Sequence, residues 1–165
     1  MFKYMVWSLA EDLKFGKLYE KVVVQNLNEN IYFNDEIKMY ENEMKQVDFR
    51  NKEIIGELKT RTNSKDRYST TMFGYNKIKY LKSLENDNRV WKFYFLFTDG
   101  LYVWSYNEDQ YEIEEFNHRE RGVIDNVHIP VKYLECISRK INSKMSFQEQ
   151  IEYINRKTEQ NDQTS

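Results

Sequence analysis

The sequence predicts a mixed α/β fold in which one sheet is flanked by helices on both faces. Three observations favour this class. Apolar residues recur with helical spacing over residues 8–27. Two apolar, β-prone runs flank a short polar break at residues 50–52, as in a hairpin. A long aromatic run at residues 91–104 alternates around a Thr-Asp-Gly turn, and its two apolar sides indicate a hairpin at the centre of the sheet.

The first helix is expected to begin at a capping box, Ser8 to Glu11, and to end near residue 27. A short strand (31–33), a polar connection (34–43) and two further strands (44–50 and 53–60) follow. Side chains two positions apart lie on the same face of a strand. In the last of these strands, Ile54, Gly56 and Leu58 therefore face one way, and Ile55, Glu57 and Lys59 the other.

The next part of the chain is expected to form a basic loop (61–67), a helix (70–86), the aromatic hairpin (91–104) and a strand (111–115). A charged loop (116–127) and two helices (131–138 and 146–156) follow. Ser69 or Thr70 is the expected cap of the second helix, and Pro130 opens the third. The order is α-β-β-β-α-β up to the aromatic hairpin. Residues 1–156 are predicted to form a single domain, and residues 157–165 a polar, disordered tail.

Composition restricts the function classes. The 165 residues are 40% hydrophobic and 16% aromatic, which is typical of one globular domain with a substantial core. A net charge of −2 excludes a globally basic nucleic-acid binder, so any phosphate-binding surface is expected to be local. The single cysteine, Cys136, excludes an internal disulfide and predicts a core thiol. Without a membrane-length apolar run or a signal pattern, we expect a soluble protein of the cytoplasm or nucleus, with no membrane partner.

Other familiar sites are not predicted. His118 and His128 lack the spacing of metal ligands, so a structural role is favoured for both. There is no glycine-rich phosphate loop and no G-x-S-x-G motif, which argues against nucleotide-binding and serine-hydrolase functions. The aromatic hairpin at 91–104 could stack bases, but its strict alternation favours a core position.

The charged residues of the hairpin at 47–59 carry the chemistry. If residues 50–52 form its turn, Asp48 lies opposite or diagonal to Glu57 on the neighbouring strand, with Lys59 on the same face. Two adjacent carboxylates repel each other unless a proton or a cation lies between them. Mg²⁺ favours one or two carboxylates together with waters and phosphate oxygens, so it is the expected occupant.

The alternative is a solvent-facing salt-bridge trio on an amphipathic hairpin, which the spacing alone favours. The neighbouring residues argue against it. Ile55 shares the face of Glu57, and Ile54 and Leu58 occupy the other face. Both faces are therefore partly apolar, and charges on a covered strand need a specific reason.

The order helix, hairpin with D-x(n)-E-x-K, helix, strand resembles the PD-(D/E)XK nuclease superfamily, which includes restriction-endonuclease-like and resolvase-like enzymes. The matching residues are Asp48, Glu57 and Lys59, with eight residues between the two acids. Glu20 corresponds by position to the acidic residue on the first helix of that family, and Lys77 to a helical Lys or Gln that assists the site. The resemblance extends over roughly residues 8–105, although Val47 replaces the proline of the family name.

The resemblance implies phosphodiester hydrolysis that depends on Mg²⁺ or Mn²⁺. Asp48 and Glu57 would bind the metal directly, with the Leu58 carbonyl as a third ligand and Glu20 holding a second metal or a metal-bound water. Lys59 would orient the nucleophilic water or stabilise developing charge. A general-base role would need a lowered pKa, which two nearby carboxylates oppose, so the electrostatic role is favoured.

The same resemblance suggests the nucleic-acid contacts. Lys77 would contact the scissile phosphate, and Arg61, Lys65 and Arg67 would form a patch for the phosphate backbone. The expected function is a DNA endonuclease. The alternatives are a non-cleaving nuclease-like module that binds nucleic acid or protein, and an RNA endonuclease of the same fold.

Specificity would come from the loops at 61–69 and 106–127, from a homodimer partner or from a larger complex. The abundance of Asn, Lys, Ile and Tyr suggests an AT-rich genome, with a phage, a virus or a mobile element as the expected source.

Overall fold

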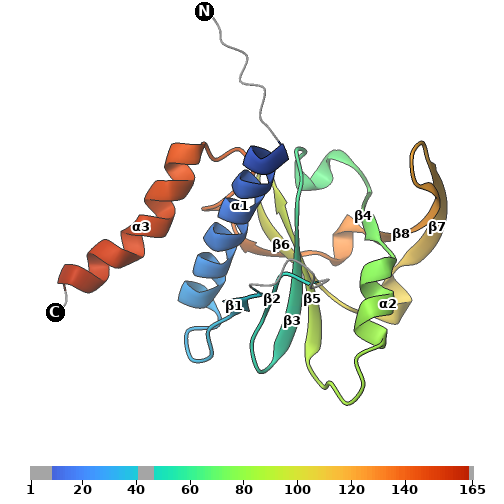
Figure 1. Cartoon of the computed structure of the whole chain (residues 1–165), viewed down its shortest axis with the longest axis horizontal. Helices are drawn as coiled ribbons and strands as arrows, with labels where there is room; N and C mark the ends of the chain where they lie inside the picture. Colours follow the sequence, from blue (N-terminus) through green and yellow to red (C-terminus); the bar gives the residue numbers. More distant parts are fainter. Residues whose placement is uncertain (1–8, 41–46, 164–165) are drawn as a thin grey trace, which may run out of the picture.

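The computed structural model of the chain describes residues 9–40 and 47–163, with the backbone alone for residues 9–17 and 157–163 (Figure 1). The first half comprises α1 (Leu9–Asn30), β1 (Lys38–Met39), β2 (Phe49–Arg50), β3 (Ile54–Thr60), β4 (Thr70–Gly74) and α2 (Asn76–Lys82). The second half comprises β5 (Val90–Phe97), β6 (Gly100–Ser105), β7 (Glu112–His118), β8 (Gly122–Pro130), β9 (Glu135–Ser138) and α3 (Phe147–Gln163). Short 3₁₀ turns lie at Lys65–Arg67, Glu108–Gln110 and Val131–Tyr133.

Within the described residues, the main sheet has six strands in the order β1-β2-β3-β5-β6-β9. β3 and β5 are parallel, and the other neighbours are antiparallel. A parallel pair needs a crossover connection, and here it contains β4 and α2. The fold is therefore mixed α/β, and the predicted order holds except that β4 is inserted before α2.

One face of the main sheet packs against α1. Tyr19, Val22, Val23 and Leu27 of α1 are buried against residues of β3, β5 and β6, among them Leu58. α3 lies beside α1 (Figure 1). The Tyr153 backbone of α3 accepts a hydrogen bond from Gln25 at 2.8 Å, so the two helices form one layer.

The other face is covered by α2 together with a second sheet, in the order β4-β8-β7. Phe73 of β4 stacks on Phe93 of β5 with ring centroids 4.4 Å apart. Ile78 of α2 and Val127 of β8 are fully buried on the same side. Helices thus lie on both faces of the main sheet, as predicted, but this face is also covered by the β4-β8-β7 sheet.

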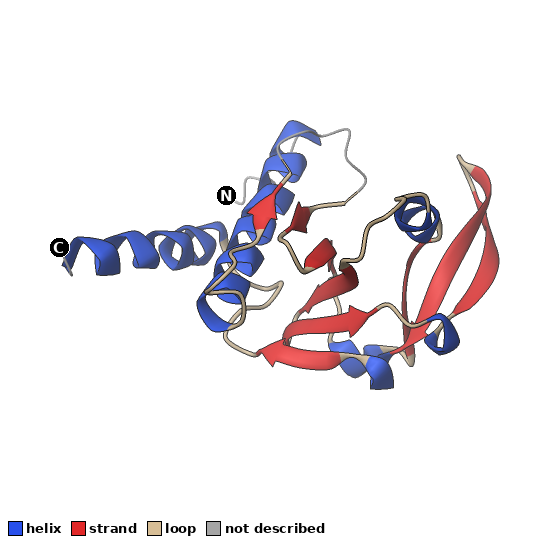
Figure 2. Cartoon of the chain, turned by 90° about the horizontal axis from the view of Figure 1, so that it is seen from below, coloured by secondary structure: helices blue, strands red, loops and turns tan. Residues whose placement is uncertain are grey.

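The β7–β8 hairpin extends away from the main sheet (Figure 2). Its tip contains Gly122 at φ 75°, in the left-handed region that glycine tolerates best. Every residue of β7 except His118 is exposed. The prediction of a charged loop at 116–127 was therefore wrong: this segment forms the end of β7 and most of β8.

Three other secondary-structure predictions were wrong. Residues 31–33 form a turn rather than a strand, because Ile31 and Tyr32 bond back to the Leu27 carbonyl at the end of α1. The helix predicted over 70–86 is strand β4 followed by the shorter α2. The helix predicted over 131–138 is a 3₁₀ turn and edge strand β9, which pairs with β6.

Cys136 in β9 is exposed, so the prediction of a core thiol was wrong. The C-terminal helix is confirmed, but α3 continues to Gln163, through most of the segment expected to be a disordered tail. The aromatic hairpin at 91–104 is confirmed as β5 and β6, which contribute to the core on both faces. Ser8 of the first capping box and residues 44–46 of the first predicted strand lie outside the described residues. No described helix has the length and apolar character needed to span a membrane.

Candidate metal and phosphate site

Asp48, the residue just before β2, is held by its backbone and its side chain. Its N–H donates to the Gly56 carbonyl at 3.0 Å, and its own carbonyl accepts from Tyr40 at 3.0 Å. Its Oδ2 accepts the Leu58 N–H at 2.7 Å. Phe49 pairs with Gly56, and Asp48 bonds to the same residue, so the regular pairing of β2 with β3 does not extend to Asp48. The bond to the Leu58 N–H fixes the direction of the Asp48 side chain, and its carboxylate lies close enough to Glu57 to raise the pKa of that acid.

Glu57 lies in the middle of β3, between β2 and β5, and is 4% exposed. Its Oε1 lies 3.3 Å from the ammonium of Lys59 and 3.3 Å from that of Lys77. Its Oε2 is buried and has no hydrogen-bond partner among the described residues. An unpaired buried carboxylate oxygen is costly, so this atom is available to a cation or a proton.

The two ammonium groups reach Glu57 from different elements. Lys59 is two residues along β3, so it projects from the same face of that strand. Lys77 comes from α2, which is anchored in the core by buried Ile78 and Leu81. Both lysine side chains keep partial exposure, 29% and 19%. They can therefore contact Glu57 and a solvent-borne anion together.

Glu20 comes from α1, next to the buried Tyr19. A side-chain hydrogen bond with Glu20 lowers the pKa of Asp48, which places the two carboxyl groups side by side. The structure thus brings Glu20, Asp48, Glu57, Lys59 and Lys77 to one place, from α1, the residue before β2, β3 and α2.

Burial and mutual repulsion raise the pKa values of the acids. The pKa of Glu57 is raised to about 7, chiefly by burial and also by the nearby Asp48 carboxylate, with the two lysines lowering it. Burial also raises the pKa of Asp48, opposed chiefly by the Leu58 N–H and by Lys59. Burial is therefore the main obstacle to ionising these two acids, and a bound cation would favour their ionised forms.

A divalent cation can be tested against these residues. No group of three or more His, Cys, Asp or Glu side chains within residues 9–40 and 47–163 is arranged to hold a metal ion. Mg²⁺, however, binds to one or two carboxylates and keeps several waters. Asp48 and Glu57 supply such a pair, and Glu57 Oε2 has no hydrogen-bond partner in the part of the chain that the structure describes. The Leu58 carbonyl lies between Glu57 and Lys59 on β3. These two carboxylates and one backbone carbonyl fit a magnesium ion that keeps its other ligands as waters.

The three residues expected to form a backbone-binding patch have different surroundings. The half-buried guanidinium of Arg61 donates to the Met72 carbonyl of β4 and lies 5.9 Å from the Phe95 ring. Lys65 pairs with Asp66 at 3.0 Å. Arg67 is exposed and lines a separate pocket of about 510 Å³ with Lys144. Arg61 thus links β3 to the second sheet, and Arg67 is the best placed of the three for a ligand.

A pocket of about 530 Å³ opens beside Lys59 and Lys77, and sequence reasoning missed its other cations. We call it the basic groove; it is lined by Lys59, Gly74, Tyr75, Asn76, Lys77, Lys79, Arg121, Val123, Ile124, Asp125 and Asn126. The spacing of Lys77 and Lys79 was visible in the sequence, whereas Arg121 was placed in an expected loop. Arg121 lies in the turn of the β7–β8 hairpin, and β8 is joined to the first half of the chain by its pairing with β4.

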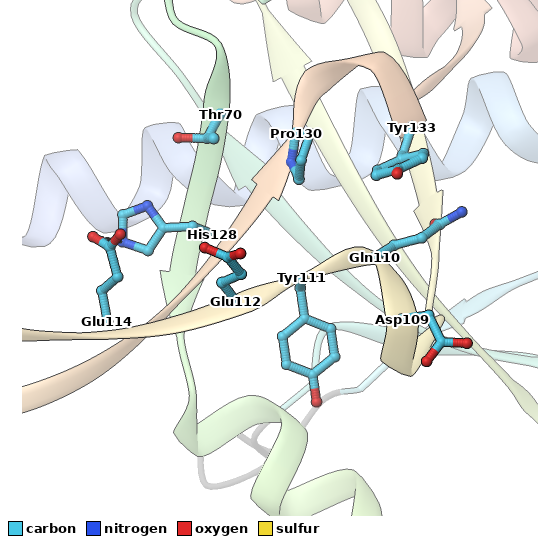
Figure 3. Close-up of a pocket in the computed structure, with 9 residues that line it drawn as sticks. All are labelled: Thr70, Asp109, Gln110, Tyr111, Glu112, Glu114, His128, Pro130 and Tyr133. Carbon is cyan, nitrogen blue, oxygen red and sulfur yellow. Dashed lines mark ion pairs between the residues drawn. The ribbon is translucent and has the colours of Figure 1, made fainter.

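A second pocket, of about 590 Å³, has the opposite charge (Figure 3). Asp109, Glu112 and Glu114 line it, and His128 lies 3.5 Å from Glu114. His118 accepts hydrogen bonds from two backbone N–H groups of the β7–β8 turn. Both histidines therefore have structural contacts, and the acidic pocket repels phosphate. No protein-family model, curated protein or solved structure matches the chain, so its function has to be inferred from the site itself.

Proposed function

We propose that this protein is a metal-dependent nuclease, a DNA endonuclease in particular, with a restriction-endonuclease-like core. One observation carries the proposal: the Asp48 carboxylate lies near the buried Glu57, and two lysines contact Glu57 beside a basic groove. The element order α1, β2, β3, α2, β5 agrees with the superfamily that the D-x(8)-E-x-K motif resembles. We also propose that the protein acts inside the cell, where such a substrate is found.

The residues of the chain divide the work as follows. Asp48 and Glu57 hold the metal, with the Leu58 carbonyl and Glu20 completing its surroundings directly or through water. A bound divalent metal polarises the phosphate and lowers the pKa of water. Lys59, partly exposed beside Glu57, stabilises the charge that develops on the phosphoryl oxygens. Lys77 positions the scissile phosphate from α2.

The test is cleavage of labelled single-stranded, double-stranded and branched DNA, and of RNA, with Mg²⁺, Mn²⁺ or EDTA. Asp48→Asn and Glu57→Gln are expected to lower cleavage by at least about 10²-fold, because the metal supplies several kcal/mol of charge stabilisation. Glu53→Gln is the matched control, since Glu53 is exposed just before β3. Cleavage that persists in both site variants would overturn the assignment, and preference for RNA would make the protein an RNA endonuclease.

A second candidate is a nuclease-like module that binds nucleic acid without cleaving it. The observation in its favour is that Lys59 and Lys77 both contact Glu57 Oε1, which lets ammonium groups replace a metal in neutralising this acid. It predicts that Mg²⁺ neither binds to the protein nor supports cleavage. Titration of Mg²⁺ by calorimetry distinguishes the two, because only the nuclease needs a saturable metal site removed by Glu57→Gln.

A further inference from the structure

The basic groove has two walls that come from distant parts of the chain. Tyr75 and the first half of α2 form one wall, and the first half of β8 forms the other. Gly74 pairs with Asn126, and the Tyr75 N–H donates to the Asp125 carbonyl at 3.0 Å. These bonds fix the walls to each other at one end of the groove. Lys59 on β3 connects the groove to Glu57.

The charges of the groove favour an extended anion. Lys59 and Lys77 are shared with Glu57, but neither the Lys79 ammonium nor the Arg121 guanidinium forms an ion pair with a described residue. Asp125 is the one carboxylate among the lining residues. The cations thus continue from the candidate metal site along the groove, where successive phosphates of one strand would follow.

The groove also offers apolar surface, which a phosphate alone would not use. Tyr75 lines it, with the Lys79 ammonium 5.3 Å from the centre of its ring. Val123 and Ile124 line the β8 wall, and Val123 is 65% exposed. Next to them on β7, Phe116 pairs with Ile124 and is 53% exposed. Bases reach such surfaces only when they are unpaired, because a duplex presents its phosphates and sugars to the walls of a groove.

We propose that the basic groove binds an unpaired DNA strand flanking the scissile phosphate, so that the substrate is DNA with a single-stranded segment. Lys79 and Arg121 bind its phosphates, and Val123, Ile124 and the Tyr75 ring contact its bases. The acidic pocket near the base of the same hairpin, with Glu112 and Glu114, directs the strand away from that end (Figure 3). The position of the strand next to a scissile phosphate rests on the proposed nuclease function, whereas the binding of the strand in the groove does not.

Binding is tested first, without cleavage. The full-length protein in EDTA is titrated into a fluorescein-labelled single-stranded DNA of roughly 16 nucleotides, the upper site size of comparable single-strand binders, and anisotropy is followed at several salt concentrations. Lys79→Ala and Arg121→Ala are each expected to weaken binding several-fold and to reduce the salt slope by about 0.7. Arg119→Ala is the matched control, because Arg119 is exposed two residues away and does not line the groove.

Cleavage is then compared on a blunt duplex and on the same duplex with a single-stranded tail. Wild type is expected to prefer the tailed duplex. Arg121→Ala and Val123→Ser are expected to lower cleavage of the tailed duplex more than that of the blunt duplex, whereas Arg119→Ala keeps the preference of the wild type. If wild type cleaves DNA but both groove variants bind like Arg119→Ala, the groove inference is overturned and the nuclease proposal stands. If wild type cleaves nothing with either metal, the nuclease proposal fails, and the anisotropy series still decides the groove. Tighter binding of RNA of the same sequence would overturn the assignment to DNA.

Discussion

Lys77 of α2 lies 3.3 Å from the Oε1 atom of Glu57 in β3, so the crossover between two parallel strands is fastened at the candidate site. This contact lets one lysine serve two functions. It neutralises part of the charge on Glu57, and it lines the basic groove where a phosphate would bind.

Replacing Lys77 should therefore change the pH dependence as well as the rate. Lys77→Gln removes an ammonium that lowers the pKa of Glu57, so that pKa should rise above about 7 and the acid limb of the cleavage profile should move to higher pH. The rate at neutral pH should fall by about 10²-fold. Initial rates across pH measure both effects. Lys82→Gln, on the same helix but paired with Glu108, should leave the profile unchanged.

Magnesium should stabilise the protein more strongly as the pH rises. The pKa of Glu57 is raised from 4.5 to about 7 in the folded protein. In the metal-free protein its contribution to stability is therefore fully present below pH 4.5 and is lost as the pH rises through about 7. Mg²⁺ needs the ionised acid, so the shift in Tm on adding Mg²⁺ should be small at acid pH and larger above neutrality.

At a Mg²⁺ concentration ten times its Kd the gain is about 1.4 kcal/mol, which for a chain of this length corresponds to roughly 3–6 °C. Thermal melts with and without Mg²⁺ measure it. In Glu57→Gln, both the loss of metal-free stability with rising pH and the Mg²⁺ shift should become smaller. A Mg²⁺ shift that stays constant with pH would show that Glu57 does not bind the metal.

Gly56 should not tolerate a side chain. A Cβ there would lie 2.5 Å from Cε2 of the buried Phe49 ring. Gly56→Ala should therefore destabilise the protein by about 1–3 kcal/mol through overpacking, and it should lower cleavage because Asp48 bonds to the Gly56 carbonyl. Denaturant unfolding measures the first effect. The double variant with Phe49→Leu should cost less than the sum of the single changes, since the contact then disappears.

Arg61 should act on stability rather than on nucleic-acid binding. Its guanidinium donates to the Met72 carbonyl, and burial lowers its pKa. Arg61→Ala should reduce stability by about 1–3 kcal/mol, because the Met72 carbonyl loses a charged donor, and should leave the salt slope of DNA binding unchanged. Arg67 is exposed and shares a pocket with Lys144. If this pocket contacts the DNA backbone, Arg67→Ala should reduce the salt slope of DNA binding and leave the stability of the protein unchanged. Melting curves and salt titrations of the two variants separate these roles.

The sequence was most informative where burial repeats with a clear period. The alternation in β5 and β6 and the helical stripe of α1 are consequences of packing, so both elements were predictable. The approach of Asp48 to Glu57 was also predictable, because a tight hairpin between them fixes the register. Lys77 depended on the resemblance to a family, since nothing local says where α2 packs.

The missed elements lack that period. The strand predicted at 111–115 covers most of β7, but the last three residues of this almost entirely exposed strand, 116–118, were expected to begin a charged loop. β9 is an edge strand whose pairing with β6 outweighed the helix-start signal of Pro130. Arg121 lies in the turn before β8, and β8 pairs with β4, a strand some fifty residues earlier in the chain. Long-range pairing of this kind leaves no local signal.

The pairing of β4 with β8, which joins Thr70 to Pro130 and Gly74 to Asn126, also sets an order in time during synthesis. A ribosome completes both carboxylates and both lysines of the site well before it completes the second wall of the groove. At roughly 5–20 residues per second this interval lasts seconds, during which β4 lacks its partner strand. We therefore expect an unfinished chain to have the acids without the second wall of the basic groove, and the proposed binding of a DNA strand to begin only once translation has passed β8.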